Sequence, residues 1–147
     1  MTTLVDLVAT RIRGEVPELT GAIEFIADLA AMVEEGALPQ RDVAGFVVPL
    51  GFDDRGGQSA AGAHTQLLAD MIGVILCVKA RGDVKARSAI PKIDVLVDKV
   101  VDAVAGWTPN NTVGVFNVKR GRLVPGAKGI IVYQLDFELL DQLRIVT

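Results

Sequence analysis

The stretch MIGVILCV at residues 71–78 fixes the centre of the predicted fold. Its alternate residues form two sets, and both sets are apolar. A strand that is apolar on both faces is covered on both faces. The stretch therefore predicts a long strand at about residues 65–80, covered by a helix on one face and by a second helix or a neighbouring subunit on the other. One face carries Ile72, Val74, Leu76 and Val78, and the other carries Met71, Gly73, Ile75 and Cys77.

A helix is predicted next, over residues 88–105. Ser88 can cap it, Pro91 suits its first turn, and Gly106 can end it. Trp107 follows this helix and is expected to pack back on the sheet. The apolar face of the helix is formed by Ile93, Leu96, Val97, Val100, Val101 and Val104.

The N-terminal part predicts a helix over residues 3–13. Thr3 and Asp6 fit a capping pattern in which a hydroxyl and a carboxylate bind free amides of the first turn. The segment after it is ambiguous. It fits a short strand near 21–26 followed by a short helix over 28–35, or one continuous helix.

Further strands are predicted on both sides of the central one. Residues 43–50 form one strand, and Pro49 places its end at an edge or a bulge because proline cannot donate to the ladder. At the C-terminus, residues 113–123 and 130–140 form a hairpin. In the second of these strands, apolar residues alternate with Gln134, Asp136 and Glu138, which predicts one buried face and one wetter face.

Between two predicted strands lies the glycine-rich stretch GFDDRGGQS, residues 51–59. Its glycine spacing is similar to a phosphate loop, but Gly57 and Gln58 occupy the positions of the required lysine and hydroxyl. Asp53 and Asp54 would also repel a polyphosphate. We therefore reject nucleotide binding and predict a surface loop that joins two strands.

Composition narrows the class of protein. A chain of 147 residues is expected to form a single domain spanning residues 1–147. The formal net charge of −3 argues against a general grip on nucleic acid. We expect no signal peptide and no membrane span. The mean hydropathy of +0.41 is high, so either the core is unusually rich or apolar surface is buried between subunits.

Reactive groups are scarce. The lone Cys77 lies in an apolar strand and fits a core residue. The lone His64 has no serine, cysteine or acid placed beside it by a motif. The adjacent carboxylates Glu34-Glu35 and Asp53-Asp54 are not acid–base pairs on adjacency alone. The scarcity of reactive groups disfavours an enzyme, and we expect no cofactor and no metal site.

Two charged groups can be interpreted functionally or as ordinary surface. Asp94, Asp98 and Asp102 recur on one helix face. This group can be a cation site, an acidic docking stripe or a solvated face. The second group is basic and can contact phosphate or an acidic partner, or it is an exposed hairpin segment. It consists of Lys119, Arg120 and Arg122.

The order of these segments resembles the tail terminator proteins of long-tailed bacteriophages. These are the group similar to the minor tail protein U of lambda and to the gp37-like proteins of Mu-type phages. The resemblance covers nearly the whole chain. Its most telling parts are AGFVVP at 44–49, AGWTP at 105–109 and YQLDF at 133–137.

The resemblance implies a small α/β (α+β) fold: a mixed, mostly antiparallel sheet with helices packed on one side. It also implies no catalysis and a ring of six copies that closes the head-proximal end of the tail tube and stops its polymerisation. The partners would be the major tail tube protein and a head-completion or connector protein, while DNA passes through the lumen. The protein would be assembled in the host bacterial cytoplasm and found in the tail of the virion.

Within this interpretation the loop at 51–59 reaches the tube or a neighbouring subunit. Its candidate contact residues are Asp53, Asp54, Arg55 and Gln58. Three alternatives stay open: a head-completion or neck connector protein, a small α/β enzyme or ligand-binding module, and a nucleic-acid-binding module. The first differs in its partner, the second predicts a pocket with converging polar groups, and the net charge argues against the third.

Overall fold

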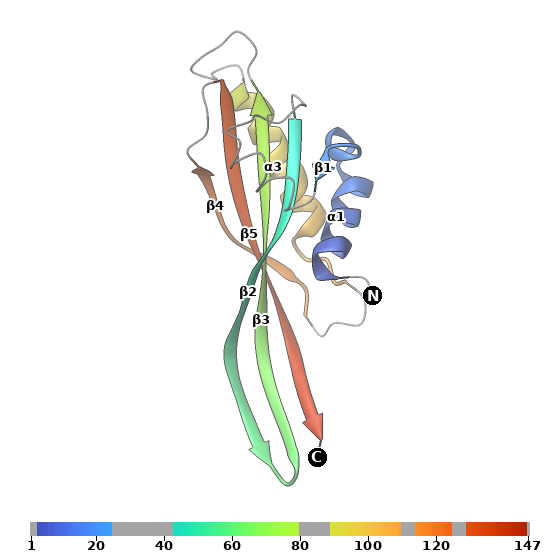
Figure 1. Ribbon diagram of the computed structural model, residues 1–147, viewed down its shortest axis with the longest axis vertical. Helices are drawn as coiled ribbons and strands as arrows, with labels where there is room; N and C mark the ends of the chain where they lie inside the picture. Colours follow the sequence, from blue (N-terminus) through green and yellow to red (C-terminus); the bar gives the residue numbers. More distant parts are fainter. Residues whose placement is uncertain (1–2, 25–42, 80–88, 110–113, 125–128, 147) are drawn as a thin grey trace.

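The computed structural model describes residues 3–24, 43–79, 89–109, 114–124 and 129–146 (Figure 1). The strands in this part of the chain form one five-stranded sheet in the order β1-β2-β3-β5-β4. β1 is parallel to β2, and the other neighbours are antiparallel. The elements are α1 (Leu4–Glu15), the 3-10 turn η1 (Pro17–Leu19), β1 (Ile23–Glu24), β2 (Val43–Ala60), β3 (Ala63–Lys79), α3 (Ile90–Val104), β4 (Phe116–Val124) and β5 (Ile130–Val146).

The two described helices, α1 and α3, lie against the same side of the sheet (Figure 1). Their buried side chains join one core cluster with β2, β3, β4 and β5. The expected fold class, a mostly antiparallel sheet with helices on one side, is confirmed. The largest fully buried side chains of this cluster include Ile12, Leu76, Phe116, Leu135 and Phe137.

Helix α1 begins where the sequence predicted. The Thr3 hydroxyl accepts a hydrogen bond from the Asp6 amide at 3.1 Å, and the Asp6 carboxylate accepts one from the Thr3 amide at 3.3 Å. This capping box satisfies two amides that have no partner inside the helix. Val8 and Ile12 are completely buried, so the helix is held to the sheet by its apolar stripe.

Helix α3 also agrees with the prediction, except at its first residue. Pro91 lies in the first turn, and the helix ends before Gly106, whose φ of +77° is accessible to glycine. The capping position is taken by Ala89, which provides no side-chain hydrogen bond. Trp107 packs back as expected and stacks on Phe116 with 5.9 Å between the ring centroids.

The central strand β3 has two buried faces in its second half. The face toward the helices contributes Ile72, Val74, Leu76 and Val78 to the main core. The opposite face places Cys77 in a second cluster, and Cys77 is a buried core residue as predicted. The second cluster consists of Ala44, Phe46, Val48, Cys77 and Ile130.

The prediction of a surface loop at residues 51–59 is wrong. This stretch is the second half of β2, and it is paired with β3 from Phe52 opposite Asp70 to Ala60 opposite Ala63. Glycine and aspartate are rare in strands, so local propensity concealed the pairing. Two bulges take up the irregularity, and Gly51 and Gly56 have φ angles of +96° and +108°.

The chain actually turns two residues later, at Ala61 and Gly62, which both have positive φ. A two-residue turn of this kind matches the twist of a hairpin. The last strand is also longer than predicted, because β5 pairs with β3 as far as Val146 opposite Ala63. Residues 51–70 and 140–146 together form a three-stranded extension, here named the arm, that projects beyond both described helices (Figure 1).

Several expectations fall outside the described residues. These are the helix predicted over 28–35, the Ser88 cap, the Glu34-Glu35 pair and most of the turn that joins β4 to β5. The short strand predicted near 21–26 is present as β1, which pairs with Gly45 and Phe46 of β2. Of the edge or bulge expected at Pro49, the bulge is present, since the register shifts between Pro49 and Gly51, but the strand does not end there.

Candidate interaction surface

The arm is the part of the described structure with the least cover. All of residues 51–62 are exposed, and Ala69 is the single buried side chain among the arm residues whose burial is described. Several of its exposed side chains are nevertheless large and apolar. They are Phe52, Leu67, Leu140, Leu143 and Ile145.

The four contact residues predicted in the supposed loop all lie on β2 within the arm. Asp54 accepts hydrogen bonds from the Gln66 side chain and from the Gly56 amide, both at 2.9 Å. These hydrogen bonds lower the pKa of Asp54, and the bond from Gln66 has the larger effect. Asp53 and Gln58 are exposed, and Gln58 lies opposite Thr65 of β3. Asp54 therefore helps to hold the hairpin together.

Near the tip of the arm the hairpin brings Ser59 opposite His64. The Ser59 hydroxyl contacts His64 Nδ1, and His64 Nε2 lies 3.1 Å from the Gln66 side-chain oxygen. The sequence had placed no serine beside His64, because it predicted a loop where the two strands pair. The third member of the series is an amide and not a carboxylate, so the histidine lacks the acid that orients the base in a catalytic triad.

Arg55 does not point freely into solvent. Its guanidinium reaches across β3 to Glu138 of β5, with 3.1 Å between the charged atoms. Lys119 of β4 binds the same carboxylate from the other side at 3.0 Å. Glu138 is only 7% exposed, and through these two ion pairs it connects β2 and β4 where the arm leaves the rest of the sheet.

The charge of Glu138 is favoured by these contacts. Burial by itself raises the pKa of Glu138, but the hydrogen bonds from Lys119 and Arg55 outweigh burial and hold the pKa below its ordinary value. Removing both cationic partners would leave a buried, unpaired charge, which destabilises a folded protein strongly. Sequence reasoning missed this site because Arg55 and Glu138 are 83 residues apart.

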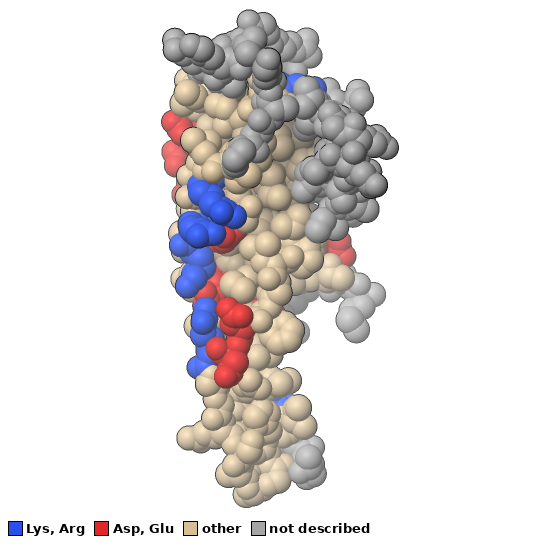
Figure 2. Space-filling model, turned by 60° about the vertical axis from the view of Figure 1, so that its left-hand side comes forward, with Lys and Arg blue, Asp and Glu red and all other residues tan. Residues whose placement is uncertain are grey.

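The basic cluster predicted on the C-terminal hairpin lies on β4. Figure 2 shows basic side chains in a stripe along one side of the molecule, with acidic side chains beside part of it. Lys119 binds Glu138, and Arg120 lies 3.8 Å from Asp136. Arg122 is exposed, and no carboxylate of the described residues lies within 4.0 Å of it.

Two further carboxylates lie at the root of the arm. Asp70 of β3 is opposite Leu139, and Asp141 of β5 is opposite Leu68, so the two side chains share one face of the sheet. Burial, and secondly the charge of Asp141, raise the pKa of Asp70. Within the described ranges neither carboxylate has a Lys or Arg ion-pair partner. The pair therefore destabilises the charged form of Asp70 in the single chain.

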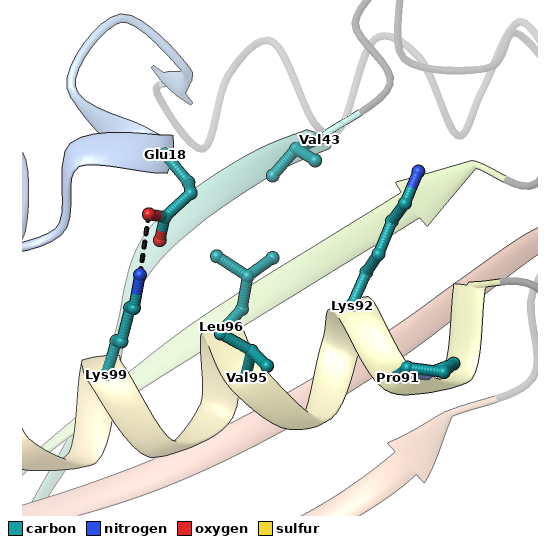
Figure 3. Close-up of a pocket in the computed structure, with 7 residues that line it drawn as sticks. All are labelled: Glu18, Val43, Pro91, Lys92, Val95, Leu96 and Lys99. Atoms are coloured by element: carbon teal, nitrogen blue, oxygen red, sulfur yellow. Dashed lines mark hydrogen bonds and ion pairs between the residues drawn. The ribbon is translucent and has the colours of Figure 1, made fainter.

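A hollow of about 420 Å³ lies between η1, the start of β2 and α3 (Figure 3). Its apolar lining comes from Val43, Val95 and Leu96. At one end Lys99 binds Glu18, with 2.7 Å between the charged atoms. Val43, on one wall of the hollow, directly follows residues 25–42, which the structure does not describe. We therefore assign no ligand to this hollow.

The acidic residues of α3 do not form a metal site among the described residues. Asp94, Asp98 and Asp102 are exposed on α3, as a solvated face is. In the part of the chain that the structure describes, no group of three or more His, Cys, Asp or Glu side chains could hold a metal ion. No helix in that part is long and apolar enough to cross a membrane.

Comparison with known protein families gives a match. A family model described as phage tail terminator protein matches residues 2–145, which is nearly the whole chain. No curated protein matches the sequence. The matched range includes the sheet, both described helices and the arm up to Ile145.

Proposed function

The chain belongs to the phage tail terminator family, and on that premise we propose that it forms a ring that caps the head-proximal end of the tail tube. It is a structural component of a phage tail. The ring would stop tube polymerisation and offer the docking surface for the head-to-tail connector. The family match over residues 2–145 is the observation that carries this proposal.

The arm supports a role in assembly. Phe52 is 65% exposed, and four other large apolar side chains of the arm are in contact with water in the single chain. A narrow sheet with neither face covered is marginally stable in water, and contiguous exposed apolar surface marks interaction sites. Contact with another molecule would bury these side chains and stabilise the arm.

We expect the ring to be a hexamer through which DNA passes during ejection. The net charge of −3 suits a lumen that lets DNA slide past without gripping it. The proposal requires no cofactor, and it places the protein at the head-proximal end of the tail after assembly in the host cytoplasm. The major tail tube protein and the head-completion protein would be its two partners.

The test is to polymerise the tail tube protein of the same phage with and without the purified full chain. Tube lengths and tube ends are then measured by electron microscopy. We expect shorter tubes with extra density at one end only, because a cap blocks addition of subunits. A matched control is Asp98→Asn, which changes an exposed carboxylate on α3 and should leave capping intact.

Tubes that elongate equally with and without the chain, and that show no density at either end, would contradict the proposal. If the chain instead bound only to filled heads, the function would be that of a head-completion protein. Both outcomes are visible in the same micrographs when heads are added as a third sample.

A further inference from the structure

The arm has a distinct apolar face that nothing in the described chain covers. Phe52 lies opposite Asp70, and Leu143 and Ile145 follow Asp141 at two-residue spacing along β5, so register places all of them on one face. Leu143 is 36% exposed and Ile145 is 47% exposed. The arm also has an excess of negative charge. Its carboxylates are Asp53, Asp54, Asp70 and Asp141, and its arginines are Arg55 and Arg144.

A second exposed surface has the opposite charge. Strand β4 contains three basic residues and no acidic residue. It also exposes apolar side chains, since Val118 is 45% exposed and Leu123 is 67% exposed. β4 is an outer strand of the sheet, so one of its edges is open among the described strands. Register places Val118 and Leu123 on the helix side of the sheet and Arg120 and Arg122 on the opposite side. The open edge of β4 therefore presents apolar side chains from one face and cations from the other.

The two surfaces cannot meet within one chain. Both belong to the same continuous sheet, with β4 beside the helical part and the arm projecting away from it (Figure 1). β4 pairs with β5 only down to Phe116 opposite Leu139, where the arm begins. Two different complementary surfaces on one subunit produce head-to-tail association, which closes into a ring when the rotation permits.

We propose that the arm of one copy docks on β4 of the next copy, with the arm carboxylates facing the β4 cations. This contact deepens the proposed function, because it rests on the ring and names the surfaces that close it. The occupant is a second copy of this chain, chosen on the complementarity of charge between the two surfaces.

Two groups that have no ion-pair partner in the described chain fit this contact. Arg122 has no carboxylate within 4.0 Å, and the carboxylates of Asp70 and Asp141 have no Lys or Arg partner there. An arginine can bind a carboxylate through two parallel hydrogen bonds, which gives geometric specificity as well as attraction. An arginine of the next copy would relieve the repulsion between Asp70 and Asp141.

The contact can be tested by cross-linking the full chain. In a Cys77→Ser background, Asp141→Cys and Arg122→Cys are combined in one chain and treated with a short bis-maleimide reagent. The proposal predicts a ladder of covalent multimers from the double variant, both in solution and on tube ends. Each single-cysteine variant should stay monomeric, because a head-to-tail contact joins unlike positions.

The possible outcomes distinguish failure of the proposed ring from failure of the proposed contact between the arm and β4. Rings without a ladder would overturn the contact and leave the proposed function intact. Dimers from a single-cysteine variant would overturn it in favour of a twofold contact. Loss of capping together with an absent ladder would overturn both the ring and the contact. If the chain bound duplex DNA, and Arg122→Glu abolished this binding without changing the mass of the ring, β4 would be assigned to nucleic acid and the contact would be overturned.

A charge reversal provides a second test that does not depend on reactive cysteines. Arg122→Glu and Asp141→Arg should each weaken subunit association at least tenfold, measured by native mass over a concentration series. The combined variant should recover most of the lost association, because it restores opposite charges across the contact. Three variants that associate like the unchanged chain, or a double variant no better than the single ones, would overturn the proposal.

Discussion

The two halves of strand β3 have opposite surroundings. From Ile72 to Val78 the side chains are buried or half-buried on both faces of the sheet, whereas from Ala63 to Leu68 none is buried. Pairing with β5 continues through both halves without a break, and pairing with β2 continues through both halves with two bulges. The comparison indicates that one half of the sheet holds the subunit together and the other half is available for contact with another molecule.

The largest effect is expected where the sheet is covered. Phe137→Ala should lower the free energy of unfolding by ~3–5 kcal/mol, because it empties a completely buried site of β5 in the main core. Denaturant unfolding followed by circular dichroism measures this loss. An effect below ~1 kcal/mol would show that the helical face is loosely packed and would break the comparison.

A smaller loss is expected where the two halves of the sheet join. Glu138→Gln keeps the shape of the side chain but removes the charge shared by Arg55 and Lys119. We expect a loss of ~1.5–3 kcal/mol, the range for hydrogen bonds to charged groups. Asp136→Asn is the matched control, since its contact with Arg120 is longer at 3.8 Å. Equal losses in both variants would contradict a special role for Glu138.

The same carboxylate predicts a dependence on pH. Because the pKa of Glu138 is lowered in the folded chain, its contribution is present above the ordinary value of 4.5 and is lost as the pH falls through the folded pKa. Asp70 acts in the opposite sense. Its pKa is raised above 3.8, so its contribution is present below that value and is lost as the pH rises through the folded pKa.

Asp70→Asn should therefore stabilise the single chain at neutral pH, by ~0.5 kcal/mol, as is usual for partly exposed charges. The same variant should weaken subunit association, because the docking contact loses a carboxylate. Thermal unfolding and native mass measure the two effects on one sample. Stabilisation without any loss of association would show that Asp70 is only a strained residue of the arm.

The smallest effect on the isolated chain is expected at the apolar surface of the arm. Phe52→Ser should change the free energy of unfolding by less than ~0.5 kcal/mol, because the side chain is mostly in water. Association should nevertheless fall, since the contact would lose its largest apolar side chain. Leu123→Ser on β4 should behave in the same way, and a difference between them would show which surface dominates.

Much of the covered half of the molecule could be predicted from the sequence. The apolar stripes of α1 and α3 and the two faces of β3 have regular spacing, and local spacing is what a sequence displays directly. The arm could not be predicted. Its β2 residues combine glycine, aspartate and two bulges, and they form a strand because β3 and β5 provide the partners.

The neighbours of the predicted contact residues could not be predicted for the same reason, because they depend on pairing between distant strands. Asp53, Asp54, Arg55 and Gln58 were correctly suspected to lie on an exposed segment, but their role as contacts stays a prediction. Arg55 meets Glu138 only because a strand replaces the predicted loop. Local rules failed at the part of the chain that we assign to assembly, where function and local preference are expected to conflict.

The most direct test compares the native mass of the full chain with that of Phe52→Ser, alone and with polymerised tail tube protein. The account predicts a ring for the unchanged chain, in solution or on tube ends, and a folded monomer with an unchanged melting temperature for the variant. A variant that forms the same rings and caps tubes equally well would contradict the assignment of the arm to assembly.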